Sequence, residues 1–297
     1  YKRQSGAGAI NVDYKTRTVE IEGITLKEGD FISLNGTTGE VYKGKVETKA
    51  AEVSGDFAAL MDLCNKYTKL NVRTNADTPH DAEVARAFGA SGIGLCRTEH
   101  MFFDAEKIVA MREMILSPDV EGRRKALAKL LPFQKADFKG IFKAMDGCPV
   151  NVRLLDPPLH EFVPHDAKGQ EEMAKAMGVT VQEIKKRVES LCEHNPMLGH
   201  RGCRLGNTYP EITEMQTQAI LGAAIELKKE GYDPHPEIMV PLTGILYEFE
   251  AQEKVIRDAA AALFEKEGME IPFKVGTMIE IPRAALTANR IASRAEY

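Results

Sequence analysis

The sequence has 297 residues, a mass of 32.8 kDa and a net charge of −5, with 43% hydrophobic and 28% charged residues. This composition supports a sizeable buried core and excludes a disordered chain. The acidic balance argues against a general nucleic-acid binder, and no apolar run reaches the roughly 18 residues that a membrane-spanning helix needs.

The length favours two domains, at about 150 residues for each. The cysteines are five in number and contain no CxxC pair, which favours a reducing compartment. We therefore expect a cytoplasmic protein, although a plastid or another organelle fits the same observation. The sequence begins at Tyr1 and stops at Tyr297 within a repeating pattern, so we expect it to be part of a longer protein.

Residues 1–47 read as β structure. Turn-forming glycine, aspartate and asparagine residues separate four short runs that alternate in part between apolar and polar residues. These runs are Ile10–Asp13, Thr18–Ile21, Phe31–Leu34 and Glu40–Tyr42. The segment has too few large apolar residues for a complete domain, so we interpret it as the end of one.

From about residue 48 the pattern changes to strands that alternate with helices. The predicted strands are Leu70–Thr74, Gly92–Arg97, Val150–Leu155, Met197–His200, Ile238–Leu242 and Lys274–Glu280. The predicted helices include Asp81–Phe88, Arg123–Met145, Glu211–Glu230, Tyr247–Glu267 and Pro282–Ile291. Six such units predict a parallel β/α barrel that is two units short of the usual eight. A polar, helix-rich stretch over 159–195 is longer than an ordinary loop and predicts an insertion.

Charged side chains gather at the ends of these predicted strands. Arg97 and Arg153 end the second and third strands, His200-Arg201 follows the fourth, and Glu280 ends the sixth. In a β/α barrel the reacting groups lie at these carboxyl ends. Guanidinium groups match phosphate and carboxylate oxygens, and a carboxylate among them can bind Mg²⁺. The pattern predicts a site for a small polyanion held with a divalent metal.

Structural interpretations stand beside this one. An arginine near a strand end is about as often a surface or ion-pair residue, and Glu280 could equally cap the helix that begins near Pro282. His100 and His200 are better explained as hydrogen-bonded structural residues, because no metal-ligand spacing surrounds them. Cys203 has no activating partner in the sequence, so we interpret it as a packing residue.

The strand ends also carry a resemblance to a known family. The stretches Gly92–Phe103, Val152–Phe162, Asn195–Leu205 and Gly276–Ala284 closely resemble the pyruvate, phosphate dikinases, which belong to the phosphoenolpyruvate-utilising enzymes. The resemblance covers nearly the whole chain. It implies that 1–47 is the C-terminal part of a swivelling phosphohistidine domain. It also implies that 48–297 is a truncated phosphoenolpyruvate/pyruvate-binding barrel with an insertion at about 159–195.

The resemblance implies a phosphotransferase that interconverts ATP, phosphate and pyruvate with AMP, diphosphate and phosphoenolpyruvate through a phosphohistidine. Arg97 and Arg153 would bind the phosphoryl and carboxylate groups of phosphoenolpyruvate. Glu280 would bind Mg²⁺ and contact the substrate. ATP and phosphate would bind in other domains, and the full-length protein would be a homodimer without membrane or nucleic-acid partners.

The sequence lacks several parts of that machinery. The family's phosphohistidine, its Gly-Thr-Asn-Asp strand with a second metal carboxylate, and its proton-donating cysteine in Cys-Gly-Glu do not occur among the 297 residues. We therefore assign no catalytic residue and expect no turnover from this chain alone. Four alternatives remain: a phosphoenolpyruvate synthase-like enzyme, a relative of enzyme I of the sugar phosphotransferase system, a Mg²⁺-dependent barrel lyase, and a non-catalytic binding module.

Overall fold

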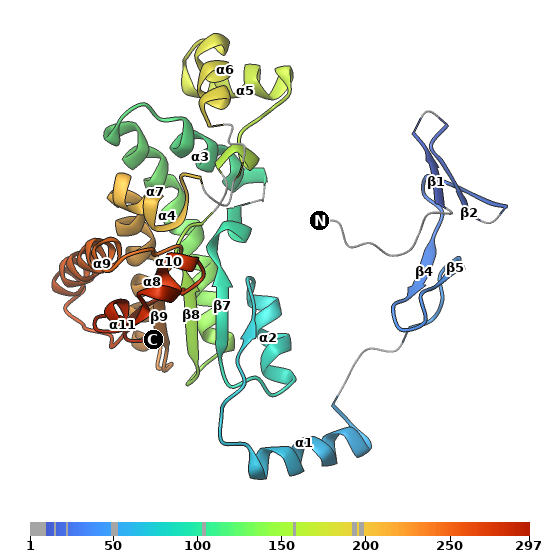
Figure 1. Cartoon of the computed structure of the whole chain (residues 1–297), viewed down its shortest axis with the longest axis horizontal. Helices are drawn as coiled ribbons and strands as arrows, with labels where there is room; N and C mark the ends of the chain where they lie inside the picture. The colour runs from blue at the N-terminus through green and yellow to red at the C-terminus, as the bar shows by residue number, and fades with distance from the viewer. Residues whose placement is uncertain are drawn as a thin grey trace. The chain divides into compact units, whose positions relative to one another are not determined.

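The computed structural model of the chain describes residues 10–14, 16–21, 23–48, 53–102, 105–156, 159–191, 195 and 199–297. Two compact units divide the chain, Tyr1–Ala59 and Leu60–Tyr297. Figure 1 shows the elements of both, and each unit is described by itself. No helix among these described residues combines the length and the hydropathy needed to span a bilayer.

The first unit contains five short strands in two antiparallel sheets. The strands are β1 (Ile10–Asp13), β2 (Thr18–Ile21), β3 (Ile24–Lys27), β4 (Ile32–Asn35) and β5 (Glu40–Lys43). Strands β1–β3 form one meander, and β4 and β5 form a hairpin. Gly23, at φ +80°, turns the chain into β3, a strand that the sequence pattern did not predict. The other four strands match their predictions to within one residue.

The second unit contains a parallel sheet of five strands. These are β6 (Thr74–Asn75), β7 (Ile93–Arg97), β8 (Pro149–Arg153), β9 (His235–Val240) and β10 (Lys274–Thr277). Their order in the sheet is their order in the chain, and each adjacent pair is parallel. All carboxyl ends therefore meet along one edge of the sheet.

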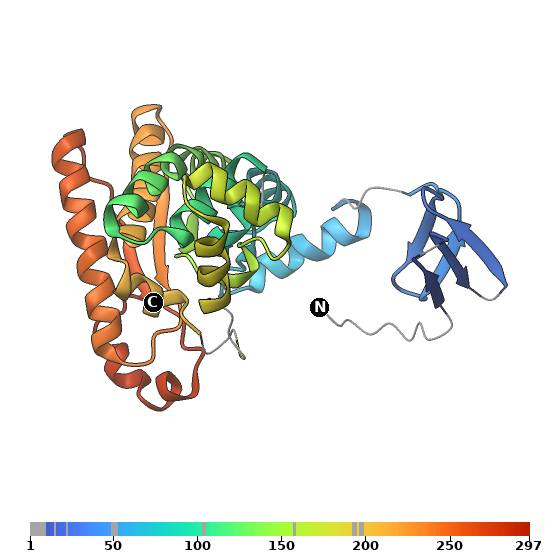
Figure 2. The same ribbon diagram turned by 90° about the horizontal axis from the view of Figure 1, so that it is seen from above.

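Helices connect these strands and cover the sheet. They are α1 (Gly55–Tyr67), which crosses the division between the units, α2 (Pro79–Ala87), α3 (Ala105–Leu116), α4 (Val120–Ala144), α5 (Ala167–Met177), α6 (Val181–Ser190), α7 (Gly202–Thr208), α8 (Pro210–Lys229), α9 (Leu246–Glu267), α10 (Pro282–Leu286) and α11 (Ala288–Ile291). Helices α2, α4, α8 and α9 pack one against the next in the order of the strands they follow (Figure 2).

Apolar side chains of the sheet and of α4 and α8 form the main core. Val152 and Ile238 on adjacent strands are fully buried, as are Phe138 and Phe142, which lie one turn apart on α4. Burial of one such side chain stabilises the folded state by about 1.5–3 kcal/mol. The helical spacing of the buried residues on α4, and the buried apolar residues Val150 and Val152 on β8 and Ile238 and Val240 on β9, explain why these elements could be predicted.

Three predictions about the second unit are wrong. The strand expected over Leu70–Thr74 begins only at Thr74 and continues to Asn75, as β6. The described part of the expected strand Met197–His200, namely Gly199 and His200, lies in a bend. Strand β9 pairs directly with β8, so no position remains between them for that strand, and the sheet has five strands rather than six. The helix expected over 282–291 is interrupted at Thr287, which ends α10 and precedes α11.

The insertion predicted at 159–195 contains the two helices α5 and α6, much as the pattern indicated. Asp166 caps the start of α5, and Gly178, at φ +67°, ends it. Thr180 and Glu183 form a capping box at the start of α6. The pair has a small core of its own, separate from that of the sheet.

Candidate functional site

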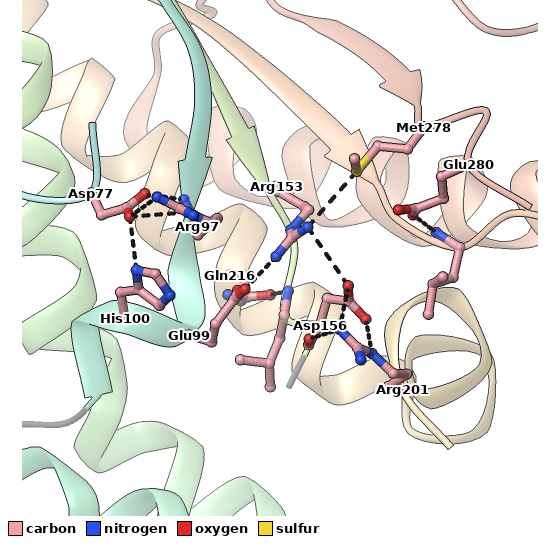
Figure 3. Close-up of polar contacts among 12 residues, drawn as sticks. Asp77, Arg97, Glu99, His100, Arg153, Asp156, Arg201, Gln216, Met278 and Glu280 are labelled. Atoms are coloured by element: carbon pink, nitrogen blue, oxygen red, sulfur yellow. Dashed lines mark hydrogen bonds and ion pairs between the residues drawn. The ribbon is translucent and has the colours of Figure 1, made fainter. Parts of the chain in front are cut away.

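A row of charged side chains follows the carboxyl edge of the parallel sheet (Figure 3). Strand by strand, the edge contributes Asp77 after β6, Arg97 and Glu99 from the end of β7, Arg153 and Asp156 from the end of β8, and Glu280 after β10. Arg201, the residue that precedes α7, joins the row from the insertion side. The structure thus brings the three predicted residues Arg97, Arg153 and Glu280 to one edge.

Asp77 orients the first arginine. Its carboxylate accepts a hydrogen bond from the Arg97 backbone N–H at 2.8 Å and another from Arg97 Nε at 3.0 Å, and it lies 2.8 Å from Arg97 Nη2. His100 Nδ1 lies 2.8 Å from the same carboxylate. The Arg97 side chain remains 34% exposed, so its guanidinium is both oriented and accessible. His100 is hydrogen-bonded, as its structural interpretation required.

Arg153 is more deeply buried, with 12% of its side chain exposed. Its Nη2 donates a short hydrogen bond to Glu99 Oε1. Its Nη1 has only distant contacts, with Asp156 at 3.7 Å and the sulfur of Met278 at 3.9 Å. Arg153 Nε and Glu99 Oε2 are buried without a hydrogen-bond partner among the described residues. The guanidinium is therefore held by Glu99 through Nη2, while Nη1 has only long contacts and Nε has no partner among the described residues.

The third arginine has the most complete pairing. Arg201 Nε and Nη2 donate to the two carboxylate oxygens of Asp156 at 2.7 and 3.0 Å, and Nη2 also donates to the Asp156 carbonyl at 2.8 Å. Asp156 is only 2% exposed. Burial lowers the pKa of Arg201, but the hydrogen bonds and charge of Asp156 outweigh it, and the pKa stays above its ordinary value. Arg201 is therefore held in place by Asp156 through both charge and hydrogen bonds.

Glu280 is exposed, and one of its oxygens is already oriented. Its Oε1 accepts a hydrogen bond from the Leu242 backbone N–H at 2.8 Å. Leu242 has φ +59°, a left-handed conformation that is uncommon for a residue with a branched side chain. The alternative role of Glu280 as a helix cap is wrong, because α10 begins after Ile281 without a side-chain cap. Among the described residues, no group of three or more His, Cys, Asp or Glu side chains could hold a metal.

Other charged or reactive residues lie outside the row. Arg73, which precedes β6, pairs with Glu237 at 2.6 Å in the first half of β9, away from the carboxyl edge. Cys96 and Cys203 belong to the core of the sheet. Burial raises the pKa of the Cys203 thiol to about 12 and that of Cys96 well above its usual range. Neither thiol is a nucleophile near neutral pH.

The sequence pattern identified the arginines but not their carboxylate partners. Glu99 and Asp156 both stood inside recognised motifs, Gly92–Phe103 and Val152–Phe162, without an assigned role. Both are at most 8% exposed, which is rare for an unpaired acid. An acid directly after a predicted parallel strand, near an arginine on the neighbouring strand, was the available signal.

Comparisons with known proteins show the family of the chain. A family model described as "PEP-utilising enzyme, PEP-binding domain" matches residues 51–297. The chain is 54% identical over 294 residues to a pyruvate, phosphate dikinase of Clostridium symbiosum and 55% identical over 293 residues to one of Giardia intestinalis. It is 52% identical over 296 residues to the chloroplastic pyruvate, phosphate dikinase 1 of Oryza sativa subsp. japonica.

Each of these alignments covers 99% of the chain but only 31–34% of the relative. The chain thus spans about a third of the length of these curated relatives, all of which are named as dikinases, a kind of transferase. Because the family model matches most of the chain, this protein belongs to the PEP-utilising enzymes.

Proposed function

We propose that this chain carries the phosphoenolpyruvate/pyruvate half-site of a pyruvate, phosphate dikinase. The observation that carries the proposal is the alignment of three arginines and Glu280 along the carboxyl edge of one parallel sheet (Figure 3). The names of the relatives support the same assignment. The whole reaction would interconvert ATP, phosphate and pyruvate with AMP, diphosphate and phosphoenolpyruvate through a phosphohistidine.

The sheet fits a (β/α)8 barrel of which this chain supplies five strands. Its strand order never reverses, in contrast to a doubly wound sheet, and its helices follow one another in the same order. In our proposal 48–297 belongs to this phosphoenolpyruvate-binding barrel, with the insertion at 159–195. Residues 1–47 are the C-terminal part of the phosphohistidine domain.

The arginines suit the two anionic groups of phosphoenolpyruvate. Arg97, which is oriented by Asp77 and exposed in part, would bind one of them, and Nη1 of Arg153, whose contacts are long, would bind the other. Transfer of the phosphoryl group leaves the enolate of pyruvate. Guanidinium groups fixed in advance stabilise both the phosphoryl charge and the enolate oxygen, and they do so without reorganisation during the reaction.

Glu280 suits Mg²⁺ as a single carboxylate ligand from the protein. Glu280 is exposed and has one oxygen oriented by Leu242, and Mg²⁺ at phosphate sites commonly uses one or two carboxylates together with substrate oxygens and water. When bound, Mg²⁺ would neutralise charge on the phosphoryl group and the enolate. Glu280 itself would orient the metal at the end of β10, across the row from Arg97.

The remaining steps belong to parts of the dikinase outside these residues. ATP and phosphate would bind there, the phosphohistidine would carry the phosphoryl group, and the full-length protein would be a homodimer. This chain alone would therefore not turn over. A phosphoenolpyruvate synthase-like or enzyme I-like protein is the alternative. A requirement for inorganic phosphate and the release of diphosphate distinguish the dikinase from both.

The test uses the full-length protein that contains this chain. Formation of phosphoenolpyruvate from ATP, phosphate and pyruvate is measured for Arg97→Ala, Arg153→Ala and Glu280→Ala. Each should lose about 10²–10³ in rate, the usual cost of removing one preorganised group. Arg124→Ala is the matched control, because Arg124 forms an exposed ion pair on α4. Unchanged rates in the site variants would refute the proposal.

A further inference from the structure

Each arginine of the row has its own buried carboxylate, and the three pairs are not equivalent. Asp77 receives three donors from Arg97, and Asp156 receives two on its carboxylate from Arg201. Glu99 receives a single donor, Nη2 of Arg153. Its second oxygen has no hydrogen-bond partner within the described part of the chain, although the residue is only 8% exposed.

The contact between Glu99 and Arg153 fixes the direction of the guanidinium. With Nη2 held by Glu99, the opposite nitrogen Nη1 points between Asp156 and Met278, where it makes only a long ion pair with the Asp156 carboxylate at 3.7 Å and a weak hydrogen bond to the Met278 sulfur at 3.9 Å. An anion bound there could use Nη1 while Glu99 keeps Nη2. Glu99 therefore holds Nη2 of Arg153 and leaves Nη1 available to a bound anion.

The same contact also cancels the charge that the anion would meet. The three arginines and the three carboxylates Asp77, Glu99 and Asp156 sum to zero, and Glu280 adds one further negative charge at the edge. A phosphoenolpyruvate anion that approaches Arg153 also approaches the unpartnered oxygen of Glu99. The anion and the Glu99 carboxylate repel each other, and burial of Glu99 limits the screening of this repulsion by solvent and salt.

We propose that Glu99 is a positioning residue with two effects: it holds Arg153 toward the ligand, and its charge makes binding of the anion depend on a cation at Glu280. This inference rests on the proposed function of the edge as a phosphoenolpyruvate site. It adds a reason for metal dependence that lies in the protein's own ion pairs, since the three arginine–carboxylate pairs together carry no net positive charge to attract an anion.

Two substitutions separate the effects. Glu99→Gln keeps an oxygen that can accept from Arg153 but removes the charge, whereas Glu99→Ala removes both. Binding of phosphoenolpyruvate to the full-length protein that contains this chain is measured by titration calorimetry with Mg²⁺ and with EDTA. Without Mg²⁺, Glu99→Gln should bind about tenfold more tightly than the unaltered protein, the factor expected for loss of one like charge within about 6 Å. The ratio of affinities with and without Mg²⁺ should fall accordingly.

Glu99→Ala should bind more weakly than Glu99→Gln under both conditions, because the guanidinium loses its anchor. Glu237→Gln is the matched control, since Glu237 is an equally buried acid paired with an arginine away from the carboxyl edge. It should leave the Mg²⁺ ratio unchanged. Thermal unfolding of each variant verifies folding, and the Gln variant alone tests the charge effect if the Ala variant does not fold.

The outcomes distinguish the two proposals. If the unaltered protein binds phosphoenolpyruvate with Mg²⁺ but Glu99→Gln shows the same Mg²⁺ ratio, the role of Glu99 is refuted and the proposed function stands. Equal affinities of the Gln and Ala variants would refute the positioning effect. No binding to the unaltered protein with Mg²⁺ would overturn both proposals.

Discussion

Replacement of Asp156 by Asn should destabilise the second unit strongly. The substitution keeps the shape of the side chain but removes the carboxylate that pairs with Arg201, whose side chain is 17% exposed. Loss of one partner from a buried ion pair costs about 3–5 kcal/mol, because the remaining charge stays buried without compensation. The residual exposure of Arg201 favours the lower end, about 3 kcal/mol. For a unit of this size the melting temperature should fall by about 6–12 °C.

Urea unfolding followed by far-UV circular dichroism measures this loss. Asp258→Asn is the control, because Asp258 is 65% exposed and pairs with Lys254 on the surface of α9, so its loss should change stability by less than about 1 kcal/mol. The double variant Asp156→Asn/Arg201→Met should be less destabilised than the sum of its single variants. A midpoint for Asp156→Asn equal to that of the unaltered chain, or strict additivity in the double variant, would contradict the argument.

Two further predictions concern the sheet and its core. Gly92→Ala should lower the free energy of unfolding in urea by about 1–3 kcal/mol, because the added Cβ would lie 2.8 Å from the carbonyl oxygen of Pro149. The control Gly36→Ala adds a Cβ in open space and should leave the stability unchanged. Equal unfolding midpoints for the two variants would disprove this. Because burial raises the pKa of Cys203 from 9.0 to about 12, the stability that its neutral thiol contributes is complete below pH 9 and is lost as the pH rises toward 12. Alkylation at pH 8 should therefore label the exposed Cys64 in the folded chain and Cys203 only after unfolding, and equal labelling rates would count against the burial.

The fold could be predicted where local pattern and burial coincide. Strands β7 and β8 carry buried apolar residues at Ile93, Cys96, Val150 and Val152, and α4 shows its buried face at helical spacing. The expected strand at 197–200 failed for a different reason. A short apolar run with a glycine fits a strand or a loop equally well, and the direct pairing of β8 with β9 is decided by tertiary structure.

The candidate site was predictable only in part. Arg97 and Arg153 stand out because each ends a recognisable strand, and Glu280 follows another. Their partners could not be assigned, because the contact of Glu99 with Arg153 joins two neighbouring strands and depends on the register between them. Register is a property of the paired sheet, so a reading of one strand at a time does not contain it.

The helices α5 and α6 pack on a cluster of their own, built from Leu116, Val163, Met173, Ala174, Ile184 and Val188, and share no buried residue with the core of the sheet. Such a cluster can open as a local cooperative unit, at a free energy below that of global unfolding. Helices α5 and α6 can therefore fluctuate or diverge in sequence while the strands stay intact. The ends of β7 and β8, which carry Arg97 and Arg153, would keep their spacing throughout.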